Sequence, residues 1–167
     1  MSNPILIDPL KHAREGRQIA GKLPVSGLDE RVASELVDTA GEVSWTLSGF
    51  IDNLRRPSLR IELAASLSVP CGRCLQPLAV DLKADTVITL FSSEDKLEEA
   101  VEADESLDAI IAEPELDVLA LIEDEIIMGL PLSPLHDDCG TEHLARAKAD
   151  KPNPFAVLAA LKSRKSE

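Results

Sequence analysis

Hydrophobic and polar residues alternate in three consecutive stretches of the chain, at 43–51, 59–69 and 78–90. A period of two is typical of β-strands that have one buried face and one wet face. Because the connections between these stretches are short, we expect the strands to pair as an antiparallel meander. The run Cys71–Cys74 (CGRC) then lies at the tip of the second hairpin. A partly alternating stretch at 16–25 predicts one further strand.

Other segments carry apolar residues at helical spacing, which predicts helices near 27–38 and 115–128. A shorter helical segment is expected at 8–14, because Asp8 is a favourable helix cap and Pro9 a favourable first helical residue. The whole pattern indicates an α+β fold, in which helices pack on one face of an antiparallel sheet. At 167 residues the chain is long enough for one domain, which we expect to span all of it.

The formal net charge of −13 comes from one segment of the sequence. Fourteen acidic residues and a single lysine lie between Glu94 and Glu125, and the rest of the chain has 16 acidic and 16 basic residues. Little periodicity is visible across the first part of this segment. We therefore expect an acidic, flexible inserted loop at 92–114. Such a segment is usually a solvated face, and its functional alternative is a surface that attracts a basic protein partner.

Several classes of protein are disfavoured by the sequence. No run of 18 apolar residues is present, so we expect no membrane span, and the first ten residues lack the pattern of a secretory signal. Three cysteines, two of them close together, indicate thiols or a metal site in the cytoplasm and not a disulfide framework. No Gly-rich phosphate loop, Ser-His-Asp set or HExxH motif appears. We therefore expect neither catalysis nor a small-molecule substrate.

Two pairs of residues have a spacing that suits a metal ion. Cys71 and Cys74 are separated by two residues, the spacing at which a tight turn can direct both sulfurs at one tetrahedral ion. His136 and Cys139 repeat this spacing and can complete a Cys3His zinc site. The alternative is a turn with reduced thiols that has no relation to the loop at Cys139. A redox disulfide is less favoured, because low-pKa redox cysteines usually lie at a helix N-terminus.

Four arginines form a candidate contact for RNA or another partner. Arg55, Arg56 and Arg60 lie near the first hairpin, and Arg73 lies between the two cysteines of the turn. A few arginines suffice for weak, salt-sensitive binding to phosphates. The alternative is ordinary surface charge, and the acidic segment opposes binding to RNA unless it points away or a partner neutralises it.

The C-terminal residues 151–167 are predicted to form a helical tail. Asn153 caps this helix, Pro154 occupies its first position, and Phe155, Leu158 and Leu161 share one apolar face. The tail can pack on its own sheet, or it can serve as a segment that binds a groove on another protein.

Five sequence features together resemble one protein family. They are the DP start at Asp8, the FIDNLRR run at 50–56, the CGRC turn, the block LDVLALIEDEIIMGLPLSPLHDDC at 116–139 and the block KPNPFAVLAALK at 151–162. The chain resembles the YceD family, the large ribosomal RNA subunit accumulation proteins of bacteria, over nearly its whole length. Some members carry further cysteine pairs after the position of the Leu-Pro pair at 130–131, as a zinc-ribbon-like end. This chain has only Cys139 there, which leaves His136 or His143 as the substitute ligand.

The resemblance implies a non-catalytic accessory factor in the synthesis, processing or stability of 23S ribosomal RNA. The partner would be 23S rRNA or a pre-50S particle, contacted directly or through a protein. One alternative is an adaptor that acts on an RNA-processing nuclease or an assembly factor without contact to RNA. A metal-dependent RNA-processing enzyme is the other, and it would need converging carboxylates. Zinc is the one cofactor that the sequence suggests.

Overall fold

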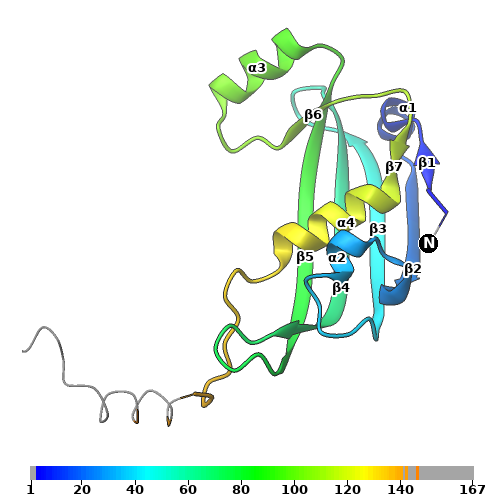
Figure 1. The fold of residues 1–167 in the computed structure, drawn as a ribbon. Helices are drawn as coiled ribbons and strands as arrows, with labels where there is room; N and C mark the ends of the chain where they lie inside the picture. The colour runs from blue at the N-terminus through cyan, green and yellow to red at the C-terminus, as the bar shows by residue number, and fades with distance from the viewer. Residues whose placement is uncertain (1–2, 141, 143–145, 147–167) are drawn as a thin grey trace, which may run out of the picture.

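A computed structural model describes residues 3–140, 142 and 146 of the chain (Figure 1). The predicted tail at 151–167 and His143 lie outside these residues. Strands and helices follow one another along the chain in the order β1 (Leu6–Ile7), α1 (Pro9–Arg14), β2 (Gln18–Pro24), a 3-10 turn (Val25–Gly27), α2 (Glu30–Ala33), β3 (Glu42–Ile51), β4 (Pro57–Pro70), β5 (Pro77–Phe91), α3 (Glu94–Ala103), β6 (Ala109–Ile111), β7 (Leu116–Asp117) and α4 (Val118–Gly129).

Five of the strands form one sheet in the order β2-β3-β4-β5-β6. The strands from β2 to β5 pair antiparallel with their neighbours, as the alternation predicts. The longest ladder of this sheet joins β4 to β5, from Ser58 opposite Thr89 to Pro70 opposite Pro77. Strand β6 is short and pairs in parallel with the last residues of β5. The predicted α+β fold with a mainly antiparallel sheet is therefore confirmed.

The hydrophobic core lies between one face of the sheet and the helices. Every second residue of β3 and β4 is buried on this face, including Leu47 and Ile61, which are fully buried. Helix α4 covers the sheet with a stripe that contains Ile122 and Ile126 (Figure 1). Helix α1 packs on the same face, close to Gly49 of β3. The opposite face carries mainly small polar and charged side chains, which explains the alternation in the sequence.

Three acidic residues of α4 help to fix this helix in place. Glu123 is buried and accepts a hydrogen bond from the backbone N–H of Asp29 (2.8 Å), at the N-terminus of α2. Arg31 of α2 then reaches Glu123 (3.2 Å) and Asp124 (2.6 Å). The buried carboxylate of Glu125 accepts a hydrogen bond from the hydroxyl of Thr86 on β5 (2.8 Å). Part of the acidic segment therefore has a structural role, because buried carboxylates need such partners.

The expected acidic loop at 92–114 is wrong in one respect, because this segment contains α3 and β6. Acidic residues in the first turn of α3 complement the positive end of the helix dipole. Leu97, Ala100 and Val101 follow at helical spacing and are half-buried. This short stripe was hidden in the sequence by the five acidic residues around it. No residue of α3 is buried, and Figure 1 shows the helix at one end of the sheet.

Two of the other predicted helices are shorter than expected. The helix near 27–38 is reduced to α2, because Val25–Gly27 forms a 3-10 turn and Asp29 caps the helix by accepting a bond from the N–H of Arg31. Helix α4 begins at Val118 and not at 115, because Leu116 and Asp117 pair with β1. None of the helices in the described part of the chain is long and apolar enough to cross a membrane.

The close approach of α1 to β3 generates a prediction about Gly49. A Cβ atom at this position would overlap the backbone carbonyl of His12, which cannot move as a flexible side chain can. We expect Gly49→Ala to lower the free energy of unfolding by about 1–3 kcal/mol, the usual cost of overpacking. Urea denaturation measures this difference. Ser48→Ala, on the opposite face of the same strand, is the matched control, and equal losses for both variants would contradict the packing described.

Candidate metal centre

The Cys turn closes the long β4–β5 hairpin. Cys71 continues the buried positions of β4, two residues after buried Val69, and it is fully buried. Its N–H donates to the carbonyl of Gln76 (3.0 Å), and its carbonyl accepts from the N–H of Leu75 (2.9 Å). Leu75 adopts a left-handed conformation with φ of 61° and its side chain is 75% exposed. A left-handed conformation is unfavourable for leucine. At Leu75 it lets the chain turn back after Cys74 and enter β5 at Pro77.

The loop that follows α4 lies against this turn. The N–H of Gly72 donates to the carbonyl of Pro134 (2.8 Å). The guanidinium of Arg73 donates to the carbonyl of Cys139, and the same side chain lies against Gly140, which has a φ of 75°. These contacts hold the loop that contains His136 and Cys139 against the tip of the hairpin.

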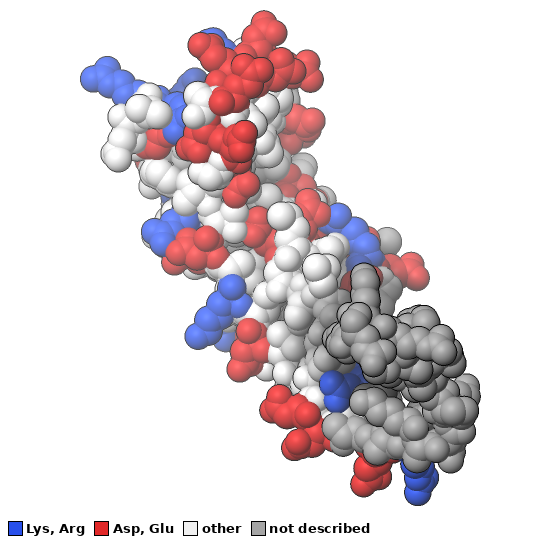
Figure 2. Space-filling model, turned by 90° about the vertical axis from the view of Figure 1, so that its left-hand side faces the viewer, with Lys and Arg blue, Asp and Glu red and all other residues white. Residues whose placement is uncertain are grey.

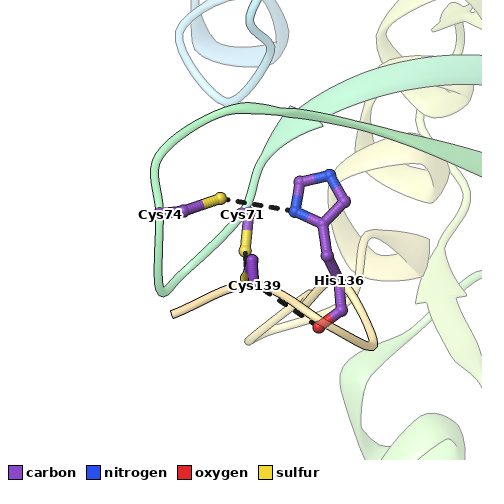
Figure 3. Close-up of side chains that lie close together, drawn as sticks. All are labelled: Cys71, Cys74, His136 and Cys139. Atoms are coloured by element: carbon purple, nitrogen blue, oxygen red, sulfur yellow. Dashed lines mark hydrogen bonds between the residues drawn. The ribbon is translucent and has the colours of Figure 1, made fainter. Parts of the chain in front are cut away.

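Four potential metal ligands meet at this contact, as the two spacings predict. The ligand atoms of Cys71, Cys74, His136 and Cys139 all lie within 4.8 Å of one another (Figure 3). The Sγ atoms of Cys71 and Cys139 are 3.4 Å apart, and Sγ of Cys74 is 3.4 Å from Nδ1 of His136. Zinc binds thiolate sulfur at about 2.3 Å, so two sulfurs on one tetrahedral ion lie about 3.8 Å apart. The four residues therefore have the size and the donor atoms of a Cys3His zinc site.

His136 is oriented by its second ring nitrogen. Nε2 lies 3.0 Å from the backbone carbonyl of Pro77, the first residue of β5. In the neutral ring, an N–H at Nε2 that donates to this carbonyl leaves the other nitrogen, Nδ1, free to bind a metal ion, and Nδ1 faces the sulfurs. Metal-bound histidines usually have such an outer partner, which fixes both the tautomer and the orientation of the ring. This arrangement is a second observation, independent of the sulfur distances, that fits a metal ligand.

The electrostatic surroundings favour the thiolate form of Cys71. Backbone N–H groups, first that of Cys74 and then those of His136 and Arg73, lower the pKa of the Cys71 thiol to about 5. Hydrogen bonding to Cys71, with a smaller contribution from Cys74, raises the pKa of His136, whereas burial raises the pKa of Cys139. A thiolate is the form of cysteine that binds metals, so Cys71 is ready as a ligand at neutral pH.

The structure does not bring the four candidate arginines together. Arg55 and Arg56 lie in the loop before β4, whereas Arg73 lies beyond the other end of this strand. The 14 residues of β4 separate the two groups by about 45 Å, at about 3.3 Å per residue. Arg60 lies on the exposed face of β4 and forms a two-bond ion pair with Asp85 (2.6 and 2.7 Å). A single basic patch of the four residues is therefore absent.

Asp52 organises the loop that contains Arg55 and Arg56. One of its carboxylate oxygens accepts bonds from the N–H groups of Leu54 (2.9 Å) and Arg56 (2.8 Å), and the other accepts from Nε of Arg56 (2.7 Å). Arg55 is held at a φ of 61°, and its backbone N–H donates to the carbonyl of Asp52 (3.0 Å). Its exposed side chain forms no hydrogen bond or ion pair with any described residue. Leu54 beside it is 71% exposed. Among the four arginines, Arg55 alone offers a side chain without a partner in the described part of the chain.

Some residues that shape the centre could not be found from spacing. Pro77 and Pro134 contribute only backbone carbonyls, and a carbonyl leaves no signal in the choice of side chain. Arg73 connects the two halves of the centre through the carbonyl of Cys139, a contact that depends on the tertiary fold. A glycine after Cys74 would have indicated the left-handed conformation at this position, but the chain has Leu75 there.

Comparisons with known proteins relate the chain to one family. Residues 59–162 match the family model described as "Large ribosomal RNA subunit accumulation protein YceD", a span that includes all four residues of the candidate centre. The chain is 28% identical over 170 residues to the large ribosomal RNA subunit accumulation protein YceD of Haemophilus influenzae, and the alignment covers 96% of this chain and 97% of the relative. No solved structure gives a significant match.

The geometry of the centre predicts its metal content. The protein purified in reducing buffer is expected to bind one zinc ion per chain, measured by elemental analysis. Cys74→Ser should lower the zinc affinity by at least about 100-fold in a chelator competition, because even changes to outer-shell partners lower metal affinity by about 10–100-fold. Leu75→Ser, in the same turn but without a ligand atom, should keep the wild-type affinity. Zinc well below one per chain, or equal affinities for both variants, would show that the cluster is a set of free thiols.

Proposed function

The chain belongs to the YceD family of large ribosomal RNA subunit accumulation proteins, and on this basis we propose that it supports the accumulation of large-subunit ribosomal RNA as a non-catalytic accessory factor. The observation that carries the proposal is the match to a relative of that name over nearly the full length of both chains. In this proposal the protein acts in the synthesis, processing or stability of 23S rRNA, in the cytoplasm.

In this proposal zinc at the Cys3His centre of Cys71, Cys74, His136 and Cys139 is structural. Four protein ligands fill a tetrahedral zinc ion and leave no position for water or substrate, which is the arrangement of structural zinc sites. The ion would join the β4–β5 hairpin to the loop after α4, two segments that otherwise meet through a few hydrogen bonds. It would therefore fix the loop after α4 to the tip of the hairpin.

A catalytic role has little support from the carboxylates. Cys71, Cys74, His136 and Cys139 form the one group of three or more potential ligands found in the part of the chain that the structure describes. The buried acids Glu123 and Glu125 already accept hydrogen bonds from the backbone of Asp29 and the hydroxyl of Thr86. A metal-dependent nuclease needs carboxylates that converge on open coordination positions. This arrangement supports an accessory factor over an RNA-processing enzyme.

The distribution of charge favours action through a protein partner over direct contact with RNA. Arg56, Arg60 and Arg73 already donate to acceptors of their own chain. Figure 2 shows acidic side chains gathered at the upper end of the molecule, the end at which Figure 1 places α3. Five acidic side chains on the ten residues of α3 would repel a phosphate backbone and attract a basic protein. We therefore assign the protein an adaptor role, with α3 as the side that a basic partner would meet.

This assignment predicts how variants restore 23S rRNA in cells that lack the gene. Arg55→Glu should restore the ratio of 23S to 16S rRNA as well as wild type does, because Arg55 contacts no RNA in this account. The triple variant Glu98→Gln, Glu99→Gln, Glu102→Gln should restore it less well, because it weakens attraction to the basic partner. Lys96→Gln, on the same helix, is the matched control and should restore the ratio at least as well as wild type, because it makes α3 more acidic.

A pull-down of the tagged protein separates the two modes of action. Partners that remain bound after RNase treatment support a protein-mediated role. Loss of all partners after RNase, together with failure of Arg55→Glu to restore 23S rRNA, would establish direct contact with RNA and overturn the adaptor assignment. Cleavage of precursor rRNA by the purified protein would overturn the non-catalytic assignment.

A further inference from the structure

Most of one edge of strand β5 is not covered by any described strand. Its 15 residues pair with β4 along nearly their whole length, but β6 pairs only with Thr89, Leu90 and Phe91. Figure 1 shows β6 beside one end of β5 and no strand beside the rest. An open strand edge of this length is a template for another strand, and proteins usually shorten or cover such edges.

The contacts at the two ends of β5 show which backbone groups face the open edge. The N–H of Thr89 donates to Asp108 (2.8 Å) and the carbonyl of Phe91 accepts from Ala112 (2.7 Å), both on the β6 side. The carbonyl of Pro77 meets His136 on that same side. Odd-numbered residues therefore direct their N–H and carbonyl groups away from β4. No hydrogen bond from another described residue reaches the backbone of the odd-numbered residues from 79 to 87.

The side chains on the exposed face of this edge carry alternating charges. Asp81, Lys83 and Asp85 are all exposed and follow one another on the same face of the sheet. Asp85 is already paired with Arg60, whereas Asp81 accepts only a hydrogen bond from the hydroxyl of Ser66 (2.8 Å). Lys83 forms no ion pair with any described residue. The edge thus offers one free cation directly beside one carboxylate that has no cation.

We propose that β5 of one copy pairs antiparallel with β5 of a second copy, so that the two sheets become one continuous sheet across a two-fold axis. Such an axis requires a surface that is complementary to itself. Because odd-numbered residues face the edge in both copies, only registers that place odd residues opposite odd residues form backbone hydrogen bonds.

Charge selects among these registers. An axis at Lys83 places the two lysines opposite each other and each Asp81 opposite an Asp85, and like charges directly opposite are destabilising. An axis at Leu82 places each Asp81 opposite the Lys83 of the second copy, on both sides of the axis. The carboxylate without a cation and the free cation then meet twice. We assign this register, in which residues 79–85 of each copy pair with residues 79–85 of the other.

Helix α4 brings apolar surface to the same place. Its last turn lies over Leu82, because a Cβ atom on Gly129 would come within 2.6 Å of Cδ1 of Leu82. The same turn carries Met128, which is 80% exposed. The axis at Leu82 brings the last turns of the two α4 helices to the centre of the interface, where burial of apolar side chains adds to the strand pairing.

Analytical ultracentrifugation over a wide concentration range tests the proposal on the full chain. Wild type is expected to show a concentration-dependent dimer, and Lys83→Asp to shift to monomer, because it places like charges opposite each other on both sides of the axis. The double variant Asp81→Lys, Lys83→Asp restores opposite charges in the assigned register and should restore the dimer. Lys96→Asp makes the same charge change on α3 and should dimerise as wild type does. Circular dichroism verifies that each variant is folded.

Amide hydrogen exchange gives a readout that needs no substitution. At concentrations that favour the dimer, the amides of Ala79, Asp81, Lys83 and Asp85 should exchange more slowly than at low concentration. The amides of Ala20 and Lys22, on the opposite edge of the sheet, should not change. A monomer at all concentrations, a dimer that Lys83→Asp leaves intact, or a double variant that stays monomeric would overturn the proposal.

Discussion

The pairing register of the long β4–β5 hairpin is the constraint on which the rest of the structure depends. It places the odd-numbered residues of β4 on the core face, and Cys71 continues that sequence of buried positions beyond Val69. The same register turns the even-numbered side chains of β5 toward the core and leaves its odd-numbered backbone groups at the open edge. A shift by one residue would expose Leu59 and Ile61 and would turn Cys71 away from His136 and Cys139. The core, the metal centre and the free edge therefore share one cause.

Period-two alternation was sufficient to predict the central strands, because each has one face in the core and one in water. The cysteine and histidine spacings likewise predicted the four residues of the centre, since each pair is local and only the meeting of the pairs depends on the fold. Local patterns were weaker for the acidic segment, where charge concealed the half-buried stripe at Leu97 and Val101. The same alternation implies that Arg55 and Arg73 lie at opposite ends of β4, because consecutive hairpins of a meander turn at opposite ends of a sheet, and the structure confirms this. Local patterns could not show that Arg60 is neutralised by Asp85, because that contact depends on the pairing register.

The separation of Arg55 from Arg73 changes how charge relates to the proposed function. The end of the sheet with α3 also contains the loop of Arg55 and Arg56. Hydrogen bonds from Ser106 lower the pKa of Asp104, which follows α3, and the nearby charge of Arg56 lowers it a little further. The other end contains the candidate Cys3His centre. An acidic, partly balanced end and the end with the four potential metal ligands therefore lie at opposite ends of one hairpin. This separation of charge agrees better with the proposed adaptor role than with a single RNA-binding surface.

The most direct test of the account is the coordination shell of the metal in the purified wild-type protein, measured by zinc K-edge X-ray absorption. A closed Cys3His zinc centre should give three sulfur neighbours at about 2.3 Å and one nitrogen neighbour at about 2.0–2.1 Å, with no oxygen from water. A shell with two or fewer sulfurs, or one that contains a water oxygen, would contradict a closed structural centre built from Cys71, Cys74, His136 and Cys139.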